Sequence, residues 1–460
     1  MNTKLISRQA LTALLCAMLA GCNVLKPYDQ GSLEKSAVFR VGAQADTAGI
    51  GRLQYQQMFK DSALQTLIEK ALVNNLDLKT AFSKVLVAQA DFQQSKQAFF
   101  PTLSAGLSVP ISAGGAGSDN SANSPHSYQT MLTSSWEADL WGKLKSAKRA
   151  SLASLLQTEA NRRAVRTALI ADVATSYYSL LALKAQQNVA EQSVTGWQKT
   201  VDVMKELKKA DVVTSAAIVQ SEASKFAVAA TLPDIRLAIF EQENRLNFLV
   251  GNSPGPVVAS SLDAQQGLQS PSTGLAVTML ANRPDVQAAE YGFRYAFEMS
   301  NVARSYFYPS LTIGGAAGLS SLTSFFSAAS WISSLTAGLT QPILNRGANR
   351  SRLRISEQQQ QQAAIVFKSV MLTAAGEVSN AVFAYNTASE KILTRKSQLD
   401  NLRKSVDYTQ QLVRYGFANY TEVLTAQQSL LTAELNSIND HLQQLSAGVA
   451  LYRSLGGGAN

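Results

Sequence analysis

Long stretches of the chain place apolar residues three and four positions apart, the spacing that gathers them on one face of a helix. The longest such stretch runs from Lys143 to Lys209. It is 67 residues long, has no proline and contains one glycine, Gly196. As a single helix at 1.5 Å per residue it would be about 100 Å long, which exceeds the size of a compact domain. The pattern predicts long helices that pack on one another as in a coiled coil.

Four shorter segments alternate apolar with small polar residues, which predicts β-strands. Pro101 and Pro309 each open the first strand of a pair, and Gly114 to His126 has the Gly, Ser and Asn content of an exposed hairpin loop. The expected strands are residues 101–112 and 128–141 in the first half, and 309–319 and 331–342 in the second.

The chain repeats its own motifs at a fixed spacing. Six positions recur 208 residues later without a gap: Leu72, Asn74, Asp77, Pro101, Leu103 and Gly106 at Leu280, Asn282, Asp285, Pro309, Leu311 and Gly314. Leu246 and Gly251 recur at Leu451 and Gly456, an offset of 205. Such constant spacing indicates a tandem duplication, with too few copies for a solenoid. We expect two equivalent repeats, residues 61–251 and 275–460, joined by a linker at 252–274.

Strands of about 9–11 residues with one apolar and one polar face are typical of outer-membrane barrels. A soluble hairpin packed against helices is the alternative. Four strands cannot close a barrel, and open edges inside a membrane would leave backbone groups without partners. If the strands cross a membrane, the chain must therefore oligomerise. A dimer would supply eight strands, and a trimer would supply twelve with room for a pore.

The start of the chain has the features of a secretory leader. Basic residues precede an apolar run, Leu11 to Ala20, that is too short to span a bilayer. The run leads into Gly21 and Cys22 in a pattern that resembles a bacterial lipobox, which is cut before the Cys so that the Cys becomes lipidated. An ordinary leader with a chance Cys is the alternative. We expect residues 1–21 to be the signal peptide and 22–60 a lipidated N-terminal segment.

Composition excludes several functions. Charged residues make up 16% of the chain and apolar residues 46%, which fits neither a disordered polar chain nor a bundle of membrane-spanning helices. The net charge of +9 would allow nucleic acid as a partner, but the leader argues against one. Two Cys and two His cannot form a usual structural zinc site. The sequence has no H-E-x-x-H or P-loop pattern, so we expect no metal, no cofactor and no enzymatic activity.

Several segments resemble the TolC family of outer-membrane efflux ducts, in particular its lipoprotein branch. The resemblance covers the mature chain and rests on Cys22 with Pro27-Tyr28, Phe100-Pro101, Tyr308-Pro309, Trp136 to Lys143, Gln341 to Gly347 and Tyr415 to Gln427. It implies an α+β membrane protein made of tandemly duplicated protomers. Three protomers would complete a 12-stranded β-barrel in the outer membrane and a 12-helix α-barrel across the periplasm.

The resemblance also implies how such a duct works. It would be a lipid-anchored, passive channel that receives substrates from a periplasmic adaptor and an inner-membrane pump of the resistance–nodulation–division class. A gate would lie at the periplasmic tip, where the long helices turn back near 211–214 and 416–419. Asp211 lies opposite Gly416 at the 205 offset. The family usually has Gly at both places, and Asp is tolerated because it adopts left-handed conformations more readily than most residues.

Four more side chains complete the expected tip. Glu422 falls where the family has one carboxylate of an acidic ring, although a solvated helix residue is an equal alternative. Arg414 and Tyr415 would either latch neighbouring helices or coat the surface, and Asn419 ends the second turn. A second family carboxylate position is occupied here by Thr425, a departure from the pattern.

Two other functions compete with the duct. One is an anchored periplasmic adaptor with a coiled-coil hairpin, which the two strand pairs disfavour. The other is an anchored hydrolase, which lacks a catalytic constellation. The sequence does not assign the transported substrate or locate the excess positive charge.

Overall fold

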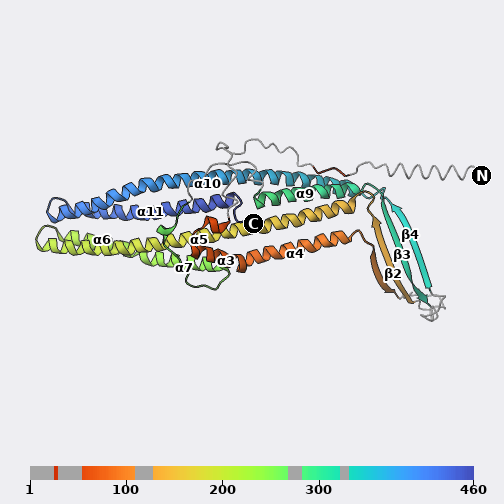
Figure 1. The fold of residues 1–460 in the computed structure, drawn as a ribbon, viewed down its shortest axis with the longest axis horizontal. Coiled ribbons are helices and arrows are strands. Elements are labelled where there is room, and N and C mark those ends of the chain that lie inside the picture. The colour runs from red at the N-terminus through yellow and green to blue at the C-terminus, as the bar shows by residue number, and fades with distance from the viewer. Residues whose placement is uncertain (1–24, 29–53, 109–127, 268–281, 322–330, 460) are drawn as a thin grey trace, which may run out of the picture. The chain divides into compact units, whose positions relative to one another are not determined.

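The computed structural model describes residues 25–28, 54–108, 128–267, 282–321 and 331–459 (Figure 1). Its helices are α2 (Tyr55–Met58), α3 (Ser62–Asn74), α4 (Leu76–Gln97), α5 (Lys143–Lys209), α6 (Ser215–Ala229), α7 (Thr231–Val250), the 3-10 turn η3 (Leu262–Ala264), α9 (Pro284–Ser305), α10 (Ala348–Arg414) and α11 (Tyr420–Ser454). Its strands are β1 (Thr102–Ser108), β2 (Tyr128–Ala138), β3 (Ser310–Ser321) and β4 (Trp331–Thr340).

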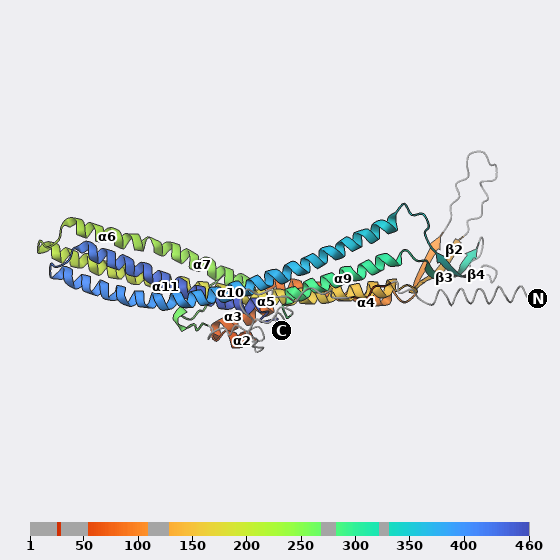
Figure 2. The same ribbon diagram turned by 90° about the horizontal axis from the view of Figure 1, so that it is seen from above.

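The chain divides into two compact units, each built from both halves of the sequence. Unit 1 contains residues 1–33, 84–158 and 288–367, and unit 2 contains 34–83, 159–287 and 368–460. Unit 1 holds the four strands, and unit 2 holds most of the long helices (Figures 1 and 2). The two stretches of unit 1 that carry strands lie about one repeat length apart, so each repeat contributes one hairpin.

The four strands form one antiparallel sheet in the order β1-β2-β3-β4. Its register brings the apolar residues of all four strands to one face, because Leu132 pairs with Ala105 and Ala317, and Ile313 pairs with Trp136 and Ala337. Several of these side chains are exposed: Leu103, Leu107, Leu132, Trp331, Leu335 and Leu339. The opposite face carries mainly small and polar residues, as in Thr102, Ser104 and Gly106, with Met131 and Ile332 as the apolar exceptions. The predicted alternation is confirmed.

The strand bounds differ in detail from the sequence prediction. β2 ends at Ala138 and not at 141, because Asp139 accepts hydrogen bonds from Leu144 N and Lys145 N (both 2.9 Å) and so caps the start of α5. β4 ends at Thr340, two residues short of the prediction, before Pro342. β3 runs to Ser321, slightly further than expected. Residues 109–112 of the first predicted strand lie outside the described residues.

The long helix predicted from the proline and glycine positions is confirmed. α5 spans Lys143–Lys209, and its counterpart α10 spans Ala348–Arg414, each 67 residues. Neither contains a proline, which would remove a backbone hydrogen bond and break the helix.

The duplication is visible in one repeated contact. Gly251 and Gly456 follow the helices α7 and α11, with φ of 75° and 80°. A Cβ on Gly251 would meet Asn74 O at 2.8 Å, and one on Gly456 would meet Asn282 O at 3.4 Å. Both members of each contact are residues that recur in the sequence, so the two halves fold alike at this point.

The main core lies in unit 2, where α3, α5, α7 and α11 meet. Leu64, Ile68, Tyr177, Leu246 and Tyr452 are fully buried within it. Burying side chains of this size stabilises the fold by roughly 1.5–3 kcal/mol each, so this cluster anchors the middle of α5.

A polar network fastens the segment before α3 to this core. Asp61 caps α3 by accepting from Ala63 N at 2.8 Å. Its other carboxylate oxygen accepts from Tyr177 Oη at 2.8 Å, Gln265 Nε2 at 2.7 Å and Ser260 Oγ. Burial alone would raise the pKa of Asp61, but the hydrogen bonds outweigh it and lower the pKa.

A second network surrounds Arg283 at the start of α9. The guanidinium is 7% exposed and lies 2.7 Å from Asp285 and 2.6 Å from Glu377, measured from nitrogen to carboxylate oxygen. It also donates to Ser454 O at 2.8 Å. One buried cation thus links α9, α10 and the end of α11 within unit 2.

Candidate functional site

Two turns reverse the chain at the far ends of α5 and α10, at the places that the sequence predicts. Both have the two backbone hydrogen bonds of a Schellman motif. One N–H donates to the carbonyl three residues earlier, and the following N–H donates to the carbonyl five residues earlier. In the first turn these are Asp211 N to Lys208 O (3.0 Å) and Val212 N to Leu207 O (2.9 Å); in the second, Gly416 N to Val413 O (3.1 Å) and Phe417 N to Leu412 O (2.9 Å). The two turns are equivalent bond for bond.

The left-handed position of this motif is occupied by Asp211 in one turn and Gly416 in the other. Their φ angles are 55° and 73°. Glycine adopts this region without strain, whereas a residue with a Cβ does so at a cost of about 1–2 kcal/mol. Asp211 is one of the types that reach it most readily, and its exposed carboxylate lies 3.5 Å from Lys208 Nζ. The departure from glycine leaves the turn geometry intact.

Asn419 and Glu422 form a capping box at the start of α11. Asn419 Oδ1 accepts from Thr421 N at 3.2 Å, and Glu422 Oε1 accepts from Asn419 N at 3.3 Å. A carboxylate in the first turn also interacts favourably with the positive end of the helix dipole. The sequence pattern Asn-x-x-Glu is the signal for this role, and our sequence analysis missed it. At the first turn, Thr214 makes no such side-chain bond.

A small apolar core joins the two turns. Met204 of α5, Ala217 of α6, Val413 of α10 and Val423 of α11 are all buried in it. Since each of the four helices contributes one residue, the two helical hairpins meet side by side at this end of unit 2 (Figure 1). Because this core is shared, a displacement of one turn would change the packing of the other.

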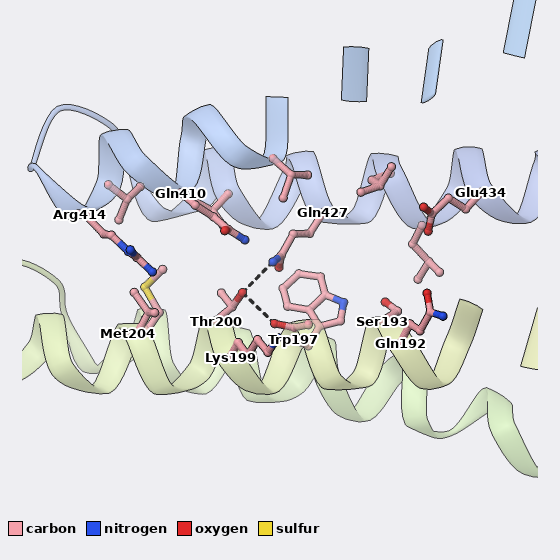
Figure 3. Close-up of a pocket in the computed structure, with 17 residues that line it drawn as sticks. Gln192, Ser193, Trp197, Lys199, Thr200, Met204, Gln410, Arg414, Gln427 and Glu434 are labelled. Carbon is pink, nitrogen blue, oxygen red and sulfur yellow. Dashed lines mark hydrogen bonds between the residues drawn. The ribbon is translucent and has the colours of Figure 1, made fainter. Parts of the chain in front are cut away.

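Behind this core lies a hollow of about 320 Å³ between α5 on one side and α10 and α11 on the other (Figure 3). Trp197, fully buried, forms part of its floor. Gln427 reaches across it and donates to Thr200 Oγ1 at 2.7 Å. Gly196 leaves space on the α5 side, because a Cβ placed there would meet no atom within 4 Å. α5, α10 and α11 therefore leave open space between them near the tip.

Arg414 and Tyr415 take different positions at the end of α10. Arg414 extends from α10 toward Met204 of α5 (Figure 3) and lines the hollow. Among the described residues, no carboxylate oxygen lies within 4.0 Å of its guanidinium. Tyr415 is 75% exposed and Phe417 is 81% exposed. The tip thus presents aromatic side chains to its surroundings.

The remaining predicted site residues lie elsewhere. Pro101 and Pro309 immediately precede β1 and β3 in unit 1, and Pro309 O accepts from Trp141 Nε1 at 2.7 Å. Gly21 and Cys22, the predicted cleavage and lipidation residues, lie outside the described residues.

The described part of the chain offers no group of three or more His, Cys, Asp or Glu side chains able to hold a metal ion. His441 is half-buried, and burial lowers the pKa of its imidazole despite the nearby Asp263. It lies on α11, away from the tip residues in sequence.

Comparison with known proteins identifies the family. A model of the outer membrane efflux protein family matches residues 67–252 and 275–457. The chain belongs to this family. The two matched ranges overlap the two predicted repeats, and the family is one of efflux channels, which favours the duct over the adaptor and the hydrolase.

Curated relatives and solved structures agree over almost the full length. The chain is 28% identical to the toluene efflux pump outer membrane protein TtgI of Pseudomonas putida over 98% of both chains. It is also 28% identical to the cation efflux system protein CusC of Escherichia coli over 96% of this chain and 97% of CusC. A crystal structure of CusC covers 94% of this chain and 99% of its own, with a TM-score of 0.86 and 25% identity. The open state of the Neisseria gonorrhoeae channel MtrE has a TM-score of 0.84, at 24% identity, covering 95% of this chain and 98% of its own. The predicted fold and the predicted outer-membrane location are confirmed.

Proposed function

We propose that the two helix turns form the periplasmic gate of this outer-membrane efflux channel. The observation that supports it is the pairing of two equivalent Schellman turns through one shared apolar core. A gate needs an element that can move as a unit, and the hollow around Trp197 leaves room for the helices behind the turns to shift. Opening would separate the turns between protomers and keep each turn intact.

The sheet accounts for the need to oligomerise, and the trimer of the family supplies the missing strand partners. β1 and β4 are the edges of a four-stranded sheet, and edges left unpaired in a membrane are unfavourable. Pairing β4 of one protomer with β1 of the next closes a ring, and three protomers supply twelve strands. The exposed apolar face then contacts lipid, and the face of small polar residues lines the pore.

The channel acts with a periplasmic adaptor and an inner-membrane pump, as members of its family do. We infer that the pump is of the resistance–nodulation–division class and that Cys22 carries the lipid anchor. No substrate is assigned, because the chain is equally identical to a relative named for toluene efflux and to one named for cation efflux.

The gate proposal predicts a specific contrast among three variants. Glu422→Gln retains the capping box, since Gln also serves at this position, but removes the charge. Asn419→Ala removes the cap at a cost of about 1 kcal/mol and keeps the charge. Glu422→Ala removes both.

Single-channel conductance in planar bilayers separates the two contributions. If three Glu422 carboxylates face one another in the closed channel, divalent cations added on the periplasmic side will block the wild type and Asn419→Ala, but neither Glu422 variant. Glu422→Ala will additionally show longer open times, because both the cap and the charge are lost. If divalent cations block the wild type and Glu422→Gln equally, Glu422 is not part of the gate and serves only as a helix cap.

A further inference from the structure

The excess positive charge of the chain is concentrated in unit 1. The described residues of unit 1 contain thirteen Lys and Arg against six Asp and Glu, a net charge of +7. Those of unit 2 contain twenty-three against twenty-two, a net charge of +1. Most of the net charge of +9 therefore belongs to the unit that holds the strands.

Within unit 1 the cations follow the strands directly. Four lie in 143–149, just after β2, and four in 346–354, just after β4. Neither 140–158 nor 343–356 contains an Asp or Glu. We call these eight residues the basic collar; they are Lys143, Lys145, Lys148, Arg149, Arg346, Arg350, Arg352 and Arg354.

Most of the basic collar lacks an acidic partner. Lys143 pairs with Glu137 at 2.9 Å and Arg149 pairs with Glu298 at 2.8 Å. The other six have no carboxylate oxygen within 4.0 Å among the described residues. All four arginines of the second group are exposed. Six cations without acidic partners, all just beyond the end at which β2 and β4 leave the sheet, favour an anionic partner.

Helix stability does not account for these cations. Neither α5 nor α10 has an acidic residue in its first turn. Basic residues at a helix N-terminus oppose the helix dipole and are unfavourable by a few tenths of a kcal/mol each. The stability of α5 and α10 therefore does not explain the cations at their starts, and an anionic partner outside the protomer does.

Aromatic and aliphatic side chains lie beside the basic collar. The ring of Tyr306 lies between two of its cations, 5.1 Å from Lys143 Nζ and 4.0 Å from Arg352 Cζ, measured to the ring centroid. Trp141 packs against Tyr308 with 5.0 Å between ring centroids. Ile343 and Leu344, just before Arg346, are 91% and 96% exposed. Amphipathic aromatic rings, exposed aliphatic side chains and cations together are typical of the level where a membrane-spanning strand meets the lipid headgroups.

We propose that the basic collar binds the headgroups of anionic phospholipids in the leaflet of the outer membrane that faces the periplasm. Ile343 and Leu344 would enter the acyl chains, and the arginines of α10 would pair with headgroup phosphates, which guanidinium groups bind in bidentate fashion. The proposal rests on the outer-membrane channel function, which places the strands in the bilayer. It explains the net positive charge of the chain by the binding of anionic lipid.

The test uses native mass spectrometry of the purified detergent-solubilised protein titrated with phosphatidylglycerol or phosphatidylcholine. The test variant replaces Arg346, Arg350 and Arg354 with Gln and spares Arg352, which packs on Tyr306. The control replaces with Gln three exposed lysines further along α10, which removes the same number of charges: Lys368, Lys396 and Lys404. Each cation near an anionic surface contributes about a factor of five in binding. The test variant should therefore lose on the order of a hundredfold in phosphatidylglycerol affinity, and the control should lose little.

The outcomes are distinct. Lost phosphatidylglycerol binding with normal conductance and normal binding in the control supports the basic collar. Unchanged phosphatidylglycerol binding overturns it, and a change of ion selectivity in that case would place the arginines in the pore. If the triple variant fails to assemble, Arg350→Gln alone is measured, and a loss smaller than about twofold against an expected fivefold also overturns the proposal. Failure of the channel function itself would appear separately, as absent conductance in the wild type.

Discussion

Arg283 offers the sharpest test of the energetics of the fold. The variant Arg283→Met keeps most of the side-chain volume but removes a guanidinium that is 7% exposed and bonded to Asp285, Glu377 and the Ser454 carbonyl. Removing one partner of a buried ion pair costs about 3–5 kcal/mol. Asp285 and Glu377 are 43% and 51% exposed, so water can partly replace the lost contacts. We therefore expect a loss of about 3 kcal/mol in the free energy of unfolding.

The assay is guanidinium unfolding in detergent, with Arg245→Met as the matched control. Arg245 is exposed on α7, and substitutions of that kind usually change stability by less than about 0.5 kcal/mol. A loss at Arg283 no larger than that of the control would refute the reasoning that this network holds α9, α10 and α11 together.

The pH dependence gives an independent check. Burial would raise the pKa of Asp285, but its bonds to Arg283 outweigh burial and lower it. A carboxyl with a lowered folded pKa stabilises the fold above its unfolded pKa, and that stabilisation is lost as the pH falls through the folded pKa. The difference between wild type and Arg283→Met should therefore narrow as the pH drops below about 4.

Two further predictions use the same unfolding assay. Gly416→Ala should cost about 1 kcal/mol because φ is 73° there, whereas Asp211→Gly should be neutral or stabilising by up to about 1 kcal/mol; equal effects of the two changes would contradict the turn geometry. Asp61→Asn should cost about 2 kcal/mol near neutral pH, because a charged acceptor of three side-chain donors is lost, and the cost should shrink as acid protonates Asp61 in the wild type; an unchanged midpoint would show that the network contributes little.

The sequence predicted the features that depend on local pattern. α5 was predicted as one long helix because residues 143–209 contain no Pro and a single Gly. The shared apolar face of the sheet was predicted from the alternation of apolar and polar residues. The end of β2 was predicted three residues too late, because Asp139 caps the start of the next helix and does not extend the strand. Hydrogen bonds decide whether these residues extend the strand or cap the helix, and the spacing of apolar residues does not show those bonds.

Other features depend on which distant segments fold together. The hollow beside Trp197 exists because α5 meets α10 and α11 there, and no single segment encodes it. The basic collar combines residues near 145 with residues near 350. These segments are far apart in the sequence and belong to the same unit only in the folded chain. The capping box at Asn419 and Glu422 is different, since its pattern was present in the sequence and a search for helix caps would have found it.

The central claim is that three copies of this chain form a gated channel, and mass together with conductance tests it most directly. The mature protein, purified in detergent, should have a protein mass of about 150 kDa, since one full-length chain is 49.3 kDa. In planar bilayers it should show a small, mostly closed conductance. A monomer of roughly 49 kDa without conductance would contradict the account, because the open edges of β1 and β4 would then have no partners.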